Sequence, residues 1–444
     1  MSFAFILTAV IVSIVLIVLL TSTLKQNTFL SMLIVALLLA VIILPAKDVV
    51  PVIQTGFGDT MKTIGIVIIL GIMIGEILDK TGATISMANA ILRLTGKKNS
   101  GLAIGMTGFI TGIPIFCNSG FIVLSGLNKS LVKNTGKPMI FMATMLAAGL
   151  YSIHCLIPPH PGAMFAVSFI KPNVGNLIMI GILIAIPAAL AGFAWARFMC
   201  RKELAHPVTE GSNEDLHTGR EALPSAFFSF LPIFIPLILL TGRSIMLLKY
   251  KESNALWVKI ISLLGYPEVA LLIGVAIALC LFKEINKKVI NELFDKAIEK
   301  AGPILVLTAA GGVFGGVIKA TGVGEQAGGY LAATGLGLLI PFVISAFLKT
   351  AQGSSTVAIM TAASIVAPML TALHLDSESG KLLATLAMGA GSMTVSHAND
   401  SYFWVVAKFS DLDTNSTLRV YTSTTLIMGI VAFASVWVAS LIML

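Results

Sequence analysis

The chain has 444 residues, of which 57% are hydrophobic and 11% are charged, and its formal net charge is +8. This composition excludes an ordinary soluble globular domain. A nucleic-acid partner is excluded as well, because the Lys and Arg residues lie in short loops between apolar runs, as the positive-inside rule for membrane proteins requires. The composition therefore predicts an all-α polytopic membrane protein surrounded by the lipid bilayer.

Apolar runs long enough to cross a hydrocarbon core, which takes roughly 20 residues, recur along the whole chain. The first run has no basic residue before it and no small-residue cleavage motif after it, so we expect a retained helix rather than a signal peptide. The expected spans are residues 3–20, 29–45, 64–78, 139–170, 177–199, 226–242, 268–282, 301–318, 382–408 and 420–443.

Two further apolar segments, residues 101–127 and 336–373, are interrupted by residues that weaken a helix. The first contains Pro114 and the polar residues 118–120, and the second contains the polar stretch 349–356. Basic residues flank the first segment on both sides, so both of its ends are expected in the cytoplasm. Each segment is predicted to be a hairpin of two half-helices, which is tolerated at membrane depth only beside protein or a water-filled cavity.

The distribution of Lys and Arg predicts that the N-terminus lies outside the cell and that most basic loops lie in the cytoplasm. The long hydrophilic stretch within residues 201–224 is then a cytoplasmic linker. It separates a first half, residues 1–200, from a second half, residues 225–444.

The two halves are predicted to be repeats. Residues 75–83 align with residues 315–323, and in each half this match is followed by a hairpin and then by a long apolar segment that is broken in the middle, 139–170 and 382–408. Because each half is expected to hold about five crossings, the second repeat is inverted relative to the first. Discontinuous helices at corresponding positions of inverted repeats are typical of a transporter site near the membrane midplane.

Asp400 is the acidic residue that we expect deep in the membrane, in the break of the second broken helix. Burying a charged side chain there costs about 2.5 to 3.5 kcal/mol even on the lenient scale, so its presence indicates a function. His397 lies in the same break, and His160 lies in the break of the first broken helix. Because histidine titrates near neutral pH, Asp400 together with His160 or His397 is expected to carry a coupling proton.

Lys349 lies at the tip of the second hairpin among hydroxyl and amide side chains, an arrangement that suits a carboxylate bearing hydroxyl groups. A Lys that extends to the membrane interface is the structural alternative. We expect Tyr151 and His154 to lie behind the site. The expected substrate contacts are Asn118, Ser119, His160, Lys349, Thr350, Gln352, Gly353, Ser354, Ser355 and Asn399.

Four motifs resemble those of the gluconate permease family of bacterial proton symporters, within the ion transporter superfamily: residues 113–116 (IPIF), 158–162 (PPHPG), 350–354 (TAQGS) and 399–401 (NDS). The resemblance spans nearly the whole chain. It implies a secondary transporter of the bacterial inner membrane that imports gluconate, a related sugar acid or hydroxy acid, or D-serine, together with protons. It also implies a homodimer in which a transport domain moves against a static scaffold, that is, an elevator mechanism.

At two positions the chain departs from the family pattern, which commonly has an acid at the position of Asn118 and Arg at that of Lys349. Lys replaces the bidentate fork of Arg by a point charge. A sodium-coupled carboxylate carrier is the alternative, with the oxygen atoms of Asn118, Ser119 and Thr356 as sodium ligands.

Two other classes of protein are weakly supported. An intramembrane enzyme would use His160, His397 and Asp400, but the sequence has no HExxH motif, no nucleophile elbow and no second deep carboxylate. A passive channel would usually draw its selectivity from symmetric rings. The cysteines lack metal-ligand spacing, so we expect neither a metal site nor an organic cofactor.

Overall fold

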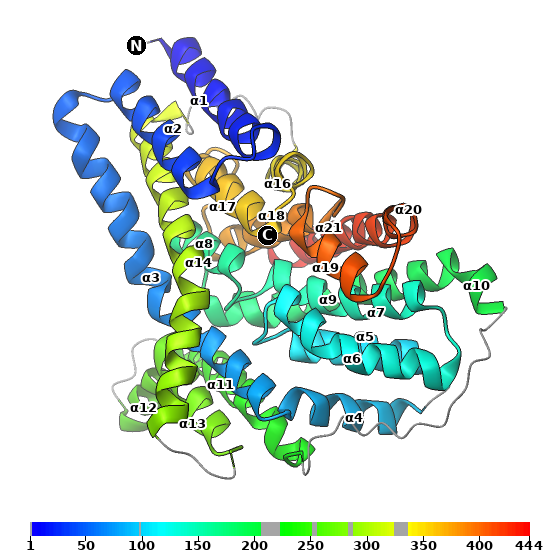
Figure 1. Cartoon of the computed structure of the whole chain (residues 1–444). Helices are drawn as coiled ribbons and strands as arrows, with labels where there is room; N and C mark the ends of the chain where they lie inside the picture. Colours follow the sequence, from blue (N-terminus) through cyan, green and yellow to red (C-terminus); the bar gives the residue numbers. More distant parts are fainter. Residues whose placement is uncertain (1, 97–98, 206–222, 251–254, 283–286, 324–335) are drawn as a thin grey trace.

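The computed structural model of the chain describes residues 2–96, 99–205, 223–250, 255–282, 287–323 and 336–444, and their regular structure is helical. The α-helices are α1 (Phe3–Val18), α2 (Thr28–Ile43), α3 (Ala46–Lys80), α4 (Ala83–Thr95), α5 (Ser100–Thr111), α6 (Cys117–Thr135), α7 (Met139–Leu156), α8 (Pro161–Ile170), α9 (Val174–Met199), α10 (Arg201–Ala205), α11 (Ala226–Lys249), α12 (Leu256–Leu264), α13 (Pro267–Leu279), α14 (Lys287–Thr321), α16 (Leu339–Gln352), α17 (Ser355–Val366), α18 (Glu378–Met393), α19 (Ser401–Phe409), α20 (Thr414–Thr417) and α21 (Ser423–Met443) (Figure 1).

The chain is a multi-pass membrane protein. Within the described ranges, seven helical stretches are long and apolar enough to cross a membrane, and an eighth is counted if α12 and α13, which meet at 69°, form one span. The expected spans 29–45 and 268–282 occur as the shorter helices α2 and α13. The expected span 382–408 is interrupted, as the sequence predicts, and forms α18 and α19.

The longest helices are α3 and α14, each of 35 residues, which pack along each other (Figure 1). The expected spans 64–78 and 301–318 are only their C-terminal parts. The two backbones approach closely, because a Cβ atom on Gly312 would lie 2.1 Å from the hydroxyl of Thr60 and 2.5 Å from the carbonyl oxygen of Gly56. Small residues permit this kind of helix contact in membranes.

Both hairpins and both broken helices form where the sequence predicts an interruption. The first hairpin is α5 with α6, and the first broken helix is α7 with α8. Its break contains Pro158 and Pro159, which have no N–H group to continue a helix, and Pro161 takes the first position of α8, where its fixed φ is favourable.

The second hairpin is α16 with α17, and the second broken helix is α18 with α19. Gly353 turns the hairpin with φ of 83°, a left-handed conformation that suits glycine. The break runs from the end of α18 to Asp400, the N-cap of α19, and includes Val395 at φ of 44°.

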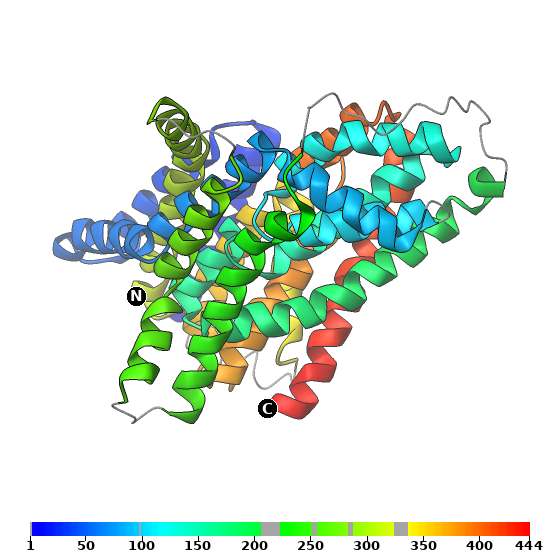
Figure 2. The same cartoon turned by 90° about the horizontal axis from the view of Figure 1, so that it is seen from below.

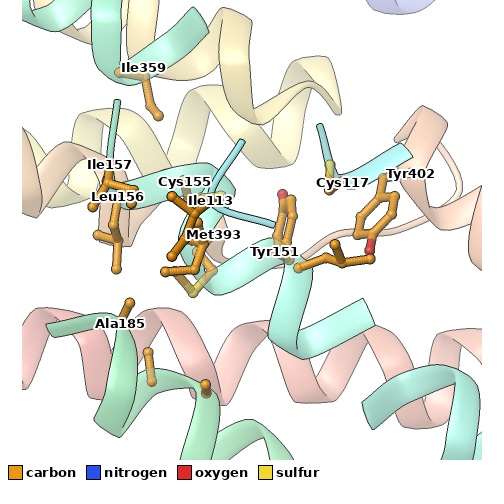
Figure 3. Close-up of a cluster of buried hydrophobic side chains, with 14 of the residues drawn as sticks. Ile113, Cys117, Tyr151, Cys155, Leu156, Ile157, Ala185, Ile359, Met393 and Tyr402 are labelled. Carbon is orange, nitrogen blue, oxygen red and sulfur yellow. The ribbon is translucent and has the colours of Figure 1, made fainter. Parts of the chain in front are cut away.

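The broken helices lie at the centre of the protein. Every residue from Phe141 to Leu156 of α7 is buried, as is every residue from Leu382 to Met393 of α18. Side chains of α7, such as Tyr151 and Cys155, pack there in one apolar cluster with residues of the hairpins and of α18 and α19 (Figure 3). The C-terminal helix α21 packs against α9 and α18 (Figure 2). At the breaks themselves, His160, Ser396 and Asp400 are buried, whereas Asn399 is exposed.

The region between the two halves is partly described. Residues 201–205 of the expected linker form the short helix α10, and residues 206–222 lie outside the described residues. In the second half, α12 is a short helix that the sequence did not predict.

Candidate functional site

A cavity of about 230 Å³ lies where the hairpins and the broken helices meet. Four helices of the described chain, α6, α8, α17 and α19, have residues of their first turn or N-cap in its wall. The N-terminal end of a helix carries about +0.5 of an elementary charge and N–H groups without a partner inside the helix. An anionic group is favoured where such helix N-termini converge.

The two halves of the sequence contribute to this cavity in the same way. The helices α6 and α17 are the second arms of the hairpins, and α8 and α19 are the second parts of the broken helices. Each interruption that the sequence predicts thus ends with a helix N-terminus at the cavity.

The first turns of these helices differ in how they are capped. The hydroxyl of Ser354 accepts a hydrogen bond from the N–H of Val357 at 3.3 Å, and Asp400 accepts one from the N–H of Tyr402 at 2.9 Å. Among the described residues, no side chain caps α6 or α8. Because α8 begins with Pro161, which has no N–H group, the first N–H groups that remain available to a ligand are those of α6.

The wall of the cavity also carries side chains that can bind hydroxyl groups. Apolar surface comes from Phe116 of the first hairpin and from Ile304 and Leu307 of α14. The hydroxyl and amide groups belong to Asn118, Ser354, Ser355, Thr356 and Ser401.

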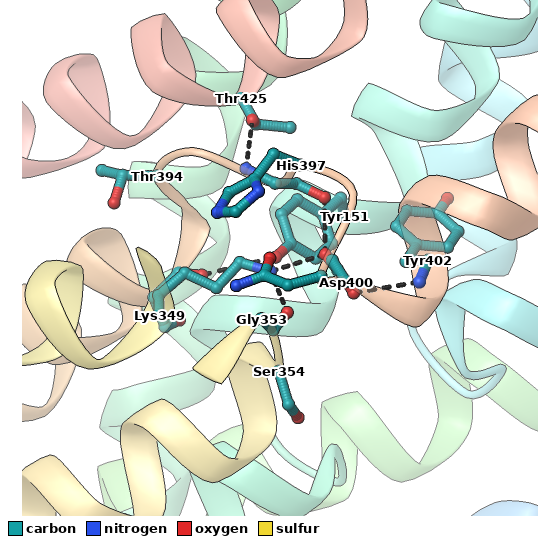
Figure 4. Close-up of polar contacts among 12 residues, drawn as sticks. Tyr151, Lys349, Gly353, Ser354, Thr394, His397, Asp400, Tyr402 and Thr425 are labelled. Carbon is teal, nitrogen blue, oxygen red and sulfur yellow. Dashed lines mark hydrogen bonds and ion pairs between the residues drawn. The ribbon is translucent and has the colours of Figure 1, made fainter. Parts of the chain in front are cut away.

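Asp400 lines the cavity and is held from behind by Lys349 (Figure 4). The ammonium of Lys349 donates hydrogen bonds to Asp400 Oδ2 and to the carbonyl oxygen of Gly353, both at 2.5 Å, and the hydroxyl of Ser396 donates to the same Oδ2 at 2.5 Å. Lys349 is fully buried and is absent from the wall. The positive charge at the second hairpin thus faces Asp400 rather than the cavity.

Two histidines of the first broken helix contact each other. His160 Nδ1 lies 3.2 Å from His154 Nδ1, and His160 Nε2 donates a hydrogen bond to the carbonyl oxygen of Gly112 at 2.8 Å. His160 is fully buried, whereas His154 lines the cavity. His160 therefore borders the site through His154.

Hydrogen bonds and a close backbone contact join the tip of the second hairpin to the second break. The carbonyl oxygen of Thr350 accepts hydrogen bonds from His397 Nε2 at 3.1 Å and from Asn399 Nδ2 at 2.9 Å. The amide atoms of Gln352 are buried and have no hydrogen-bond partner among the described residues. A Cβ atom on Gly353 would lie 2.2 Å from the carbonyl oxygen of Asn399. None of these residues lines the cavity.

Ser119 lies in a neighbouring cavity of about 150 Å³ together with Glu76 and Lys300, which form an ion pair. Phe116 lines both cavities. Ser119 is thus separated from the residues that gather around Asp400.

Tyr151 and His154 were expected behind the site, but both line the cavity. His154 lies six residues before His160, on the first part of the same broken helix. The role of His154 could have been predicted from its distance to the break. It lies in the last turn of a half-helix that ends at the site, and such a last turn also faces the site.

A multi-pass helical protein with broken helices whose N-termini converge on one cavity has the architecture of a membrane transport protein. The chain belongs to the GntP family of permeases, whose family model, described as GntP family permease, matches residues 5–442. It is therefore a permease and not an enzyme.

Relatives agree with this assignment, and a solved structure has a similar fold. The chain is 28% identical to a gluconate permease of Pseudomonas aeruginosa, with 99% of this chain and 98% of the relative covered. It is 30% identical to the low-affinity gluconate transporter of Escherichia coli, with 94% of both chains covered, and 29% identical to the Gnt-II system L-idonate transporter of the same organism, with 90% of both covered. Its fold is similar to that of the YdaH transporter of Alcanivorax borkumensis, with a TM-score of 0.64 at 15% identity over 93% of this chain and 98% of the other.

Proposed function

We propose that this permease imports gluconate or a related sugar acid by symport with protons. The observation that carries the proposal is the convergence of the N-termini of α6, α8, α17 and α19 on one cavity. Helix N-termini favour an anionic group, and the hydroxyl and amide side chains of the wall complement a polyhydroxylated chain. Relatives that carry the names of gluconate and L-idonate transporters support the same substrate class.

The binding roles follow from the position of each group. The substrate carboxylate binds at the uncapped N-terminus of α6, and its hydroxyl groups bind to Asn118, Ser354, Ser355, Thr356 and Ser401. Lys349 acts through Asp400, which it keeps in place and neutralises. Thr350, Gln352, Gly353, His397 and Asn399 shape the junction between the second hairpin and the second break, and Ser119 contacts a substrate in the neighbouring cavity on its way in or out.

We further propose a homodimer in the bacterial inner membrane with the N-terminus outside, and an elevator movement. The hairpins and the broken helices would move as one unit that carries the cavity. The packing of α5 on α7, of α16 on α18 and of α17 on α8 supports a common unit. The inverted repeat is an interpretation of the sequence, and the equal lengths of α3 and α14 support it.

Uptake of radiolabelled gluconate into proteoliposomes tests the proposed function. A pH gradient, acidic outside, should drive accumulation in the absence of sodium, and a sodium gradient should add nothing. If only a sodium gradient drives accumulation, the alternative of a sodium-coupled carrier replaces proton symport. If gluconate, L-idonate, other hydroxy acids and D-serine all fail to enter under either gradient, the proposed substrate class is wrong.

A further inference from the structure

Two neighbouring histidines at the cavity, His154 and His160, are candidates to bind the proton of the proposed symport, and their role rests on the proposed function. The geometry of the pair His154 and His160 fixes which of their ring nitrogens can accept a proton. A neutral imidazole has one nitrogen that donates and one that accepts a hydrogen bond. The hydrogen bonds of His160 determine its own tautomer and then that of His154.

The carbonyl oxygen of Gly112 only accepts hydrogen bonds, so His160 Nε2, 2.8 Å away, must carry a hydrogen. In the neutral ring His160 Nδ1 is then an acceptor. His154 Nδ1, 3.2 Å from it, must therefore be the donor. It follows that His154 Nε2 carries a lone pair and no hydrogen.

His154 belongs to the wall of the cavity, and its Nε2 atom has no hydrogen-bond partner among the described residues. Its ring stacks on Tyr151, with centroids 6.3 Å apart and planes inclined by 13°, and meets Phe116 edge to face at 6.3 Å. The ring is thus held between aromatic side chains in the wall, and Nε2 is its nitrogen without a protein partner.

The surrounding titratable and charged groups leave the cavity near neutral before a proton enters. The charge of Lys349 is paired with that of Asp400. The groups that face or adjoin His154 are Tyr151 and Cys155 of α7, His160 of the break, Cys117 of α6, Asp400 and Tyr402 of the second broken helix, and Lys349 of α16. A proton on His154 would therefore add one positive charge beside four helix N-termini, which favours a bound anion.

We propose that His154 Nε2 takes up the coupling proton, one per transport cycle, and that His160 is a positioning residue that holds His154 in the receptive tautomer. A proton from water outside binds the Nε2 lone pair and gives an imidazolium, which still donates through Nδ1 to His160. A second proton on the histidine pair would have to bind His160 Nδ1, which would set two N–H groups against each other across 3.2 Å. The bound anion stabilises the proton and the proton stabilises the anion, because coupling between two ligands is reciprocal. Both leave to water on the inside.

Proton counting on the purified full-length protein tests the proposal. With a pH indicator in weakly buffered detergent solution, the wild type should take up one proton for each gluconate bound at mildly alkaline pH. Its Kd for gluconate should rise about tenfold per pH unit there. His154→Asn keeps an amide donor at the Nδ1 position but removes Nε2, so it should bind gluconate with no proton uptake and no pH dependence. His160→Gln keeps a donor for Gly112 but removes the Nδ1 acceptor of His154, so it should still take up one proton per gluconate, with the pH dependence of its Kd displaced from that of the wild type.

A labelling experiment on the wild-type protein tests the same proposal without any variant. Diethyl pyrocarbonate modifies accessible imidazole nitrogens that carry a lone pair, so peptide mass spectrometry should find His154 modified, and gluconate should block this. His160 should be unmodified, because it is fully buried and its acceptor nitrogen lies against His154. The proposal is overturned if His154→Asn still takes up one proton per gluconate, or if His160 is modified and His154 is not. The proposal is also overturned if the wild type binds gluconate without taking up a proton. In that case the proposed transport of a sugar acid still stands. If the wild type binds no sugar acid at all, the proposed function itself fails.

Discussion

Lys349 and Asp400 form an ion pair, with 2.5 Å between Nζ and Oδ2, in which the exposed fractions of the two side chains are 0% and 5%. The pair joins α16 of the second hairpin to the N-cap of α19, two elements that the sequence separates by about fifty residues. Asp400 also accepts hydrogen bonds from Ser396 and from the N–H of Tyr402. A buried charge with so many donors is secured in place, but neither partner tolerates the loss of the other.

Breaking this pair should destabilise the protein. Lys349→Met and Asp400→Asn should each lower the free energy of unfolding by about 3 to 5 kcal/mol, because each leaves a buried polar group without its partner. The double variant should recover most of this loss, since Asn can still cap α19. Thermal unfolding of the detergent-solubilised variants measures the effect, and a double variant as unstable as the sum of both single variants would contradict it.

The turn of the second hairpin should require glycine. Gly353→Ala puts a Cβ atom 2.2 Å from the carbonyl oxygen of Asn399 at a residue with φ of 83°, so hairpin and break must move apart. We expect substrate affinity to fall at least tenfold. Gly126→Ala, in α6 with no atom within 4 Å of the new Cβ, is the matched control and should leave affinity unchanged. Equal affinities of the two variants in calorimetry would show that the hairpin turn does not shape the site.

A hydroxyl group of the wall should contribute to substrate binding. Thr356→Val removes the hydroxyl and keeps the shape, so the Kd for gluconate should rise roughly 2- to 13-fold, the equivalent of about 0.5 to 1.5 kcal/mol for one hydrogen bond. Thr361→Val on the same helix is the control, because the hydroxyl of Thr361 is buried without a partner among the described residues and its loss should not weaken binding. The contact is absent if both variants bind like the wild type.

The sequence predicts the interruptions of the fold well because their causes are local. Prolines in the first break and polar residues with Gly353 in the second hairpin stop a helix wherever it lies. The lengths of α3 and α14 could not be predicted in the same way. Their N-terminal parts are not apolar enough to count as a span, and it is packing between the two helices that keeps them helical.

The sequence predicts where the site lies better than it predicts which residues of the site contact one another. Asp400 and Ser354 could be placed from polarity and depth, but the partner of Lys349 depends on how the hairpin docks against the break. The position of His154 also depends on tertiary packing. His160 contacts one side of its ring, and His154 lines the cavity. Such pairings are tertiary, and a single sequence carries no direct signal for them.

The most direct test of the account asks whether gluconate binds at the cavity where the four helices begin. Ser401, at the first position of α19, is exposed in the wall, and a cysteine at a helix N-terminus is reactive. In Ser401→Cys with Cys117, Cys155 and Cys200 replaced by Ala, the exposed native Cys280 serves as the internal reference. Saturating gluconate should slow maleimide labelling at position 401 at least tenfold and leave labelling of Cys280 unchanged. Unchanged labelling at both positions, in a variant that still transports gluconate, would place the substrate elsewhere.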